Sequence, residues 1–173
     1  MTQPEPATLR LFIGLWPPPG AHAALLAHGD AWSWPAAARR MRPERLHVTL
    51  HFLGEVASGL LPALRRELAI EWTGCELVLD RPVVWPGGIA VLEASAVPES
   101  LAGLHAALAG RLRGLGVPVE ERPFRPHVTL ARKAVGARPP ASPVPVHWQA
   151  GPGFALVHSR PGGRGYETLQ SFG

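Results

Sequence analysis

The chain has 173 residues, 46% of them hydrophobic, and its 17 basic and 13 acidic side chains give a formal net charge of +4. This length suits one domain or two small lobes that share a cleft, and the hydrophobic share is too high for a disordered chain. The single cysteine, Cys75, excludes an internal disulfide and a cysteine-rich zinc site, and it favours a reducing compartment.

The N-terminal segment carries an acid and no base before residue 7, which argues against a secretion signal. Residues 11–29 carry no formal charge, but Pro17, Pro18 and Pro19 interrupt the run, so we predict no membrane span. We therefore expect a cytoplasmic protein. Sixteen of the basic residues are arginines, which suit phosphate oxygens, but a charge of +4 alone does not establish nucleic-acid binding.

Hydrophobic periodicity predicts an α+β protein. Strands are expected at residues 8–15, 46–53, 75–80, 89–94, 127–131, 146–150, 154–159 and 166–169. Helices are expected at 20–30, 58–70 and 98–112, and loops at 32–43 and 134–145. Gly54 is expected to end the second strand, and Ser58 to cap the helix that follows it. The run 162–165 is expected to form a hairpin turn, with an approach to a phosphate as the alternative.

A repeated tetrapeptide indicates the architecture. His-Val-Thr-Leu stands at residues 47–50 and again at 127–130, and the spacing of 127 − 47 = 80 residues is close to half the chain. Each copy follows a basic segment that contains proline. A duplicated half would place the two copies symmetrically across one cleft.

Each copy presents one polar face. Side chains alternate along a strand, so His47 and Thr49 point one way, as do His127 and Thr129. Two such faces opposed would bring two imidazoles and two hydroxyls around one small volume, without a carboxylate from either motif. One imidazole can accept a proton while the other donates one, so the pair fits metal-independent, in-line attack on a cyclic phosphodiester.

These motifs resemble those of the two-histidine (2H) phosphoesterases, with their paired His-x-Thr strands. The closer similarity is to the bacterial and archaeal RNA 2′,3′-cyclic phosphodiesterases, also called 2′-5′ RNA ligases. It spans essentially the whole chain. The stretches that carry the resemblance are 10–15, 42–55, 123–132 and 166–167.

The resemblance implies one domain, residues 1–173, made of two duplicated lobes. Two pseudo-symmetric antiparallel sheets would line a central cleft, with helices outside. It implies hydrolysis of RNA 2′,3′-cyclic ends to 2′-phosphates without metal or cofactor, and in some members reversible, ATP-independent 2′-5′ ligation. His47 would be the general acid that protonates O3′, and His127 the general base that activates water. Thr49, Thr129 and Arg132 would hold the phosphate. The expected partners are RNA ends or cyclic nucleotides, and we expect a monomer.

Alternation along the strands does not fix where several further side chains point. Arg132 lies on the face opposite His127 unless the strand ends or bulges near Ala131. His51 shares parity with His47, which would place it in the cleft, but a solvent-facing position is the alternative that we favour. Phe124 is a candidate for contact with an RNA base, while Phe12 and Phe52 are expected in the core. The arginines before the two motifs are expected either to contact RNA phosphates or to form a solvated face; they are Arg42, Arg45, Arg122 and Arg125.

Two other functions stay open on this sequence. The same site could act on another small cyclic phosphate or on a 2′-5′ oligonucleotide, or the protein could bind RNA ends without catalysis. A zinc site at His47 and His51 is excluded, because residues four apart on a strand are about 13 Å apart.

Overall fold

The structure is a computed structural model that describes residues 7–173; the segment on which the expectation about a secretion signal rests lies outside this range. Ten strands and three α-helices follow one another along the described chain. In chain order they are β1 (Thr8–Leu15), α1 (Pro19–Asp30), β2 (Arg39–Arg40), β3 (Val48–Ala57), α2 (Leu61–Glu67), β4 (Cys75–Leu79), β5 (Arg81–Trp85), β6 (Ile89–Glu93), α3 (Glu99–Gly114), β7 (His127–Arg132), β8 (Val146–Ala150), β9 (Phe154–Ser159) and β10 (Tyr166–Phe172).

The main sheet has two antiparallel halves that meet in its centre. Its strand order is β10-β9-β1-β3-β7-β6-β5, and β2 adds to β7, while β4 and β8 form a separate two-stranded sheet. The strands β3 and β7 pair at a single position, Val48 with Val128. These valines are the second residues of the two tetrapeptides, so the repeat lies on the line that relates the halves. The expected α+β class is confirmed, with the two antiparallel halves of the main sheet joined at this one pair.

Each half contains the same order of strand, helix and strand. The first unit is β1-α1-β3, with the two-residue strand β2 inserted before β3, and the second is β6-α3-β7. Adding 80 to the first residue of α1 gives 19 + 80 = 99, which is the first residue of α3. The two copies of the tetrapeptide therefore occupy corresponding places in the two units.

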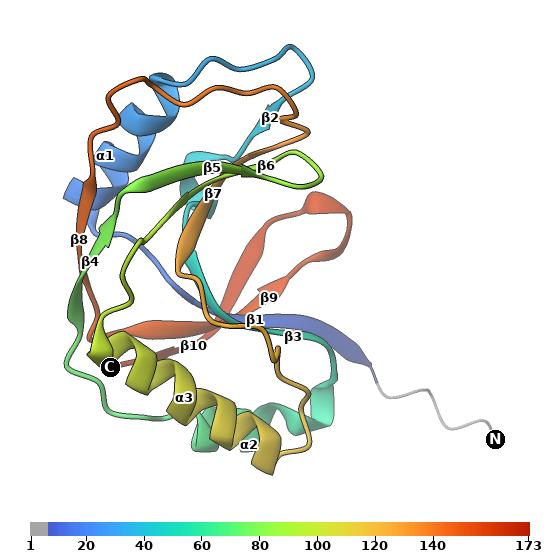
Figure 1. Ribbon diagram of the computed structural model, residues 1–173. Helices are drawn as coiled ribbons and strands as arrows, with labels where there is room; N and C mark the ends of the chain where they lie inside the picture. The colour runs from blue at the N-terminus through green and yellow to red at the C-terminus, as the bar shows by residue number, and fades with distance from the viewer. Residues whose placement is uncertain (1–6) are drawn as a thin grey trace.

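The helices lie outside the sheet halves. Figure 1 places α1 at one end of the molecule and α2 beside α3 at the other, with the strands between them. The leucine stripe expected on the third helix faces the core, because Leu101, Leu104, Leu108 and Leu112 are all at most 4% exposed. Burial of each such side chain contributes about 1.5–3 kcal/mol.

Four local expectations differ from the structure. The strand β3 continues through Gly54, which has a φ of +69° and permits a bulge instead of an end. Ser58 begins a short 3-10 turn and makes no capping hydrogen bond, so α2 is shorter than expected. Strand β5 is not among the expected strands; it contains Pro82, and its place at the edge of the sheet tolerates the missing N–H. The expected loop at 32–43 contains β2.

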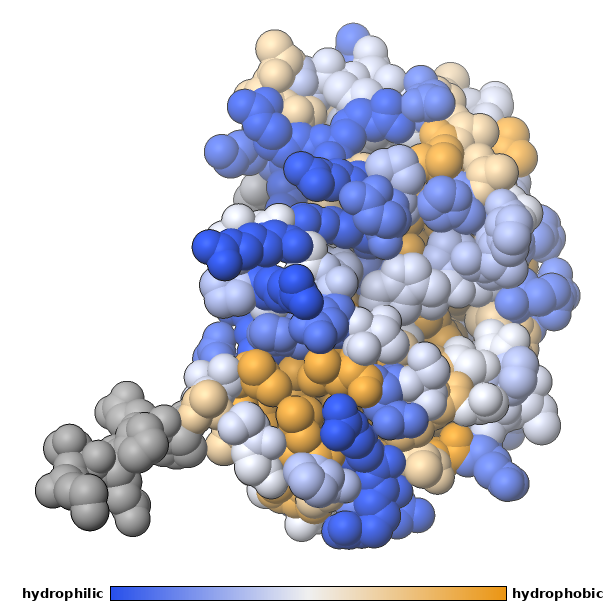
Figure 2. All heavy atoms as spheres, turned by 180° about the vertical axis from the view of Figure 1, so that it is seen from behind, coloured by the Kyte–Doolittle hydropathy of each residue, from blue (hydrophilic) through white to orange (hydrophobic). Residues whose placement is uncertain are grey.

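Hydrophilic side chains gather along the upper left of the rear face, with an apolar patch below them (Figure 2). Within residues 7–173, no helix is long and apolar enough to cross a membrane.

Candidate active site

Two equivalent bulges shape β3, which begins one residue after His47, and β7, which begins at His127. On β3, Thr49 pairs with Gly14 and His51 pairs with Ile13, so Leu50 has no partner on β1. On β7 the extra residue is Leu130, which stands 80 positions later. A bulge reverses the alternation of side chains beyond it.

The bulge at Leu130 places Arg132 on the same face of β7 as His127. This is the irregularity near Ala131 that Arg132 needs in order to reach a phosphate. The equivalent bulge on β3 brings Phe52 onto the face of His47. Phe52 is 50% exposed, so the expectation that it belongs to the core was wrong, whereas Phe12 is buried as expected.

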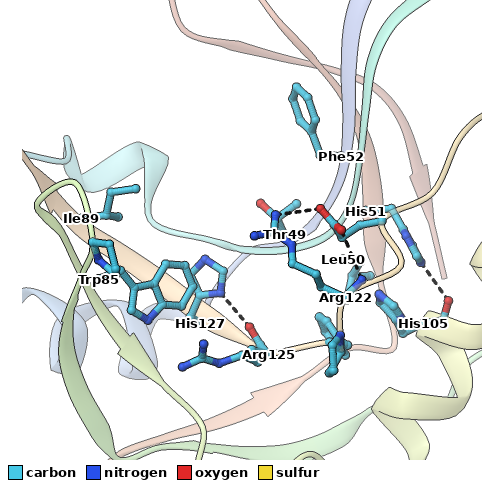
Figure 3. A pocket seen from close by; sticks show the side chains of 14 residues that line it. Thr49, Leu50, His51, Phe52, Trp85, Ile89, His105, Arg122, Arg125 and His127 are labelled. Carbon is cyan, nitrogen blue, oxygen red and sulfur yellow. Dashed lines mark hydrogen bonds and ion pairs between the residues drawn. The ribbon is translucent and has the colours of Figure 1, made fainter.

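The same bulge turns His51 off the face of His47, and His51 instead lines a larger cavity beside the histidines, so the solvent-facing position that we favoured is wrong. Its side chain is 4% exposed instead of facing solvent. Its Nε2 lies 2.9 Å from the backbone carbonyl of His105 on α3, and the two imidazoles stack with centroids 4.0 Å apart (Figure 3). His51 therefore packs β3 against α3 at the wall of that larger cavity.

Five of the six predicted site residues surround one cavity of about 410 Å³; they are His47, Thr49, His127, Thr129 and Arg132. Arg10, Arg45 and Tyr166 also line it, and no carboxylate within residues 7–173 does. Among the described residues, neither Arg10 nor Arg132 forms a salt bridge. The cavity therefore suits an anion.

Both imidazoles are held in the same way. His47 Nδ1 lies 2.6 Å from the carbonyl oxygen of Arg45, and His127 Nδ1 lies 2.7 Å from that of Arg125. Because a carbonyl oxygen only accepts, each Nδ1 carries a proton and Nε2 is left for chemistry. The hydroxyl of Thr49 lies 3.0 Å from Nε2 of His47 and donates to it while that ring is neutral.

Burial lowers the pKa of both histidines below 6.5. For His47, the hydrogen bond to the Arg45 carbonyl works against this shift, while the nearby His127 adds to it. For His127, the hydrogen bond to Arg125 and the charge of Glu93 both work against it. An anion in the cavity would raise both pKa values, because it favours the charged imidazolium.

Aromatic rings enclose the histidines. Trp16 stacks on His47 with centroids 5.0 Å apart and planes inclined by 15°, while Phe12 and Tyr166 lie at 5.0 and 5.5 Å. Trp85 on β5 packs against the ring of His127, with the ring centroids 4.4 Å apart (Figure 3). Sequence reasoning missed both tryptophans, since neither belongs to a repeated motif.

Glu93 is a further residue that sequence reasoning missed. It is the register partner of His127 and is only 1% exposed. Its carboxylate accepts hydrogen bonds from Arg125 at 2.8 and 2.9 Å and forms a salt bridge with Arg81 at 2.7 Å. Glu93 thereby fixes Arg125, whose carbonyl orients His127.

The sixth predicted residue, Phe124, lies in a larger neighbouring cavity of about 610 Å³. The two cavities share Thr49, Phe52 and His127, so they open into one another. Phe124 stacks on His105 with centroids 4.0 Å apart. This second space is mostly apolar beside the paired histidines.

No three His, Cys, Asp or Glu side chains within residues 7–173 are grouped so that they could hold a metal ion.

This fold and its paired imidazoles over a basic cavity are those of a two-histidine phosphoesterase. The family model described as "2'-5' RNA ligase superfamily" matches residues 21–144, and the chain belongs to that superfamily.

A sequence relative and two structures of one further protein agree with this assignment. An "RNA 2',3'-cyclic phosphodiesterase" of Thermus thermophilus is 33% identical over 95% of this chain and 89% of its own length. Apo LigT of Escherichia coli is 28% identical and superposes with a TM-score of 0.81, covering 95% of this chain and 96% of that one. LigT complexed with 3'-AMP gives a TM-score of 0.80 at 28% identity, covering 96% and 98%.

Proposed function

We propose that this protein hydrolyses 2′,3′-cyclic phosphodiesters at RNA ends to 2′-phosphomonoesters without a metal ion. The observation that carries the proposal is the pair of imidazoles, His47 and His127, which line one cavity rich in arginine. The relative of Thermus thermophilus, and a second one of Escherichia coli, are both named "RNA 2',3'-cyclic phosphodiesterase".

In the proposed reaction a water molecule attacks the phosphorus of the cyclic ester in line with O3′. His127 Nε2 takes a proton from the water while the new P–O bond forms. The P–O3′ bond breaks, and His47 Nε2 gives its proton to O3′. The phosphate remains on O2′. Thr49, Thr129 and Arg132 hold the non-bridging oxygens, and their positive and dipolar groups stabilise the charge that develops on them.

The surroundings of the two histidines support this assignment of acid and base. Glu93 lies beside His127 and favours its positive form, so it stabilises the imidazolium that arises when His127 accepts a proton. His47 is instead enclosed by Phe12, Trp16 and Tyr166. This apolar enclosure makes a protonated His47 a strong acid that releases its proton readily to O3′.

Phe124 is proposed to contact a nucleobase from the neighbouring cavity. That cavity joins the catalytic one at His127 and offers apolar and aromatic surface, which suits a base better than a phosphate. Stacking on an aromatic side chain contributes about 1–3 kcal/mol per base and tolerates different bases.

Hydrolysis of 2′,3′-cyclic nucleotides in the presence of EDTA tests the proposal, with the product resolved as the 2′- or the 3′-phosphate. We expect turnover without metal and a 2′-phosphate. Strict dependence on metal, or a 3′-phosphate, would contradict the mechanism. Binding of a cyclic-phosphate oligonucleotide without turnover would instead support a binding module, and a preference for 2′-5′ oligonucleotides would indicate the alternative substrate.

2′-5′ ligation corresponds to the same step in the same direction, with an RNA 5′-hydroxyl attacking the phosphorus in the place of water while O3′ leaves; attack of the 3′-hydroxyl on the 2′-5′ diester, with loss of the 5′-hydroxyl, reverses it. It stays a proposal, as does the origin of the two lobes by duplication. The cytoplasmic location and the monomeric state also stay predictions.

A further inference from the structure

A third cavity, of about 340 Å³, adjoins the catalytic one on the side of His47. The two cavities share Arg45 and Tyr166. Arg42, which precedes a 3-10 turn before β3, lines it from one side, and Arg164 lines it from the turn between β9 and β10. We call this space the arginine pocket.

The guanidinium groups of the arginine pocket are largely uncompensated. Among the described residues, Arg42 and Arg164 form no salt bridge, and both are exposed. Arg45 donates to the carbonyl of Gly163 and lies 5.5 Å from the ring centre of Tyr166. Glu44 is the one carboxylate of the lining, so three arginines and one acid leave a charge of 3 − 1 = +2.

The larger cavity on the other side of the catalytic centre differs in charge. Its two arginines are already paired, Arg122 with Glu120 and Arg125 with Glu93. A second phosphate bound beside the catalytic one would therefore gain more from the arginine pocket than from the larger cavity. The two flanking spaces divide into an apolar one that suits a base and a basic one that suits a phosphate.

We propose that the arginine pocket binds the phosphodiester on the 5′ side of the terminal nucleotide of the RNA substrate. This inference rests on the proposed function. A mononucleotide lacks that phosphate, so the pocket makes the enzyme selective for oligonucleotides. Tyr166 and Arg45 form the boundary over which the ribose connects the two phosphates.

The test compares a dinucleotide that ends in a 2′,3′-cyclic phosphate with 2′,3′-cyclic AMP. We expect wild-type kcat/KM to favour the dinucleotide by about tenfold or more, the effect of about 1.4 kcal/mol in charge-assisted contacts. The double variant R42A/R164A loses this preference and keeps its rate on 2′,3′-cyclic AMP within about twofold. The control R113A/R138A removes the same charge from exposed arginines outside the three cavities and keeps the preference.

Titration with a dinucleotide ending in a 3′-phosphate, compared with 3′-AMP, measures the same preference without turnover. Weaker binding of the dinucleotide to R42A/R164A alone supports the proposal even if the protein hydrolyses neither cyclic substrate. An unchanged preference in R42A/R164A, or an equal loss in the control, overturns it. Loss of the preference in R122A instead would place the 5′ phosphate in the larger cavity and would also overturn it. Absence of turnover on every cyclic phosphate would contradict the proposed function separately.

Discussion

Gly14 is the position at which a single methyl group should disturb the proposed general acid without touching its chemistry. It lies on β1 opposite Thr49. A Cβ atom at this position would meet Trp16 Cζ3 at 2.9 Å, Phe12 Cε2 at 3.2 Å and His47 Cδ2 at 3.4 Å. Since ordinary contacts begin near 3.4 Å, Trp16 has to move by 3.4 − 2.9 = 0.5 Å. Trp16 is stacked on His47, so we expect the imidazole to shift as well.

We expect G14A to lower kcat/KM for 2′,3′-cyclic AMP by about 10- to 100-fold, because misplacing a reacting group by about 1 Å costs about 10²-fold. Overpacking of this kind costs about 1–3 kcal/mol in the free energy of unfolding, which urea titration measures. The matched control is G103A on α3, where a Cβ meets nothing within 4 Å and adds about 1 kcal/mol of helix stability.

A positioning effect should also appear in the pH profile, since the displaced rings alter the burial that lowers the pKa of His47. The profile of G14A should therefore move relative to that of G103A. If G14A loses stability but keeps both its kcat/KM and its pH profile, the aromatic enclosure does not position His47 and this reasoning is refuted.

Three further predictions follow from the electrostatics of the site. Both histidine pKa values are lowered, and one ring must be charged while the other is neutral, so the pH optimum of kcat/KM should lie below 6.5. The pH optimum of kcat should be higher, because the bound anionic phosphate raises both pKa values. A kcat/KM optimum above pH 7 would contradict this. E93Q should lower the pKa of His127 further, and an unmoved pH profile would exclude the role given to Glu93. The same substitution should lower the free energy of unfolding, measured by urea titration, by about 3 kcal/mol; this is the low end for a broken buried ion pair, because both arginine partners are half exposed. R132A should lower kcat/KM by about 10²-fold, with partial recovery in R132K, and equal rates in all three proteins would remove Arg132 from the site.

The repeated tetrapeptide predicted the centre of the molecule because it encodes a local pattern twice. The alternation of His47 with Thr49, and of His127 with Thr129, holds over two residues and needs no tertiary information. The Val48–Val128 pair then follows from the symmetry of the two halves.

Beyond these two residues a bulge in each strand interrupts the alternation of side chains. The sequence does not predict where the side chains point there, because neither bulge leaves a clear local signal. His51 is consequently buried and Phe52 faces the cavity. On β7, Arg132 revealed the bulge only because the resemblance required it to reach a phosphate. Side chains brought in by other elements, Trp85 from β5 and Glu93 from β6, could not be placed from the sequence, since their contacts depend on how the strands pair.

The most direct measurement of the central claim is kcat/KM for 2′,3′-cyclic AMP, in EDTA, of H47A, H127A and the double variant. If the two imidazoles act as a pair on one phosphorus, each single substitution lowers kcat/KM by about 10²–10⁴-fold, and the double substitution adds little to the larger loss. A single variant that retains the wild-type rate would contradict the account.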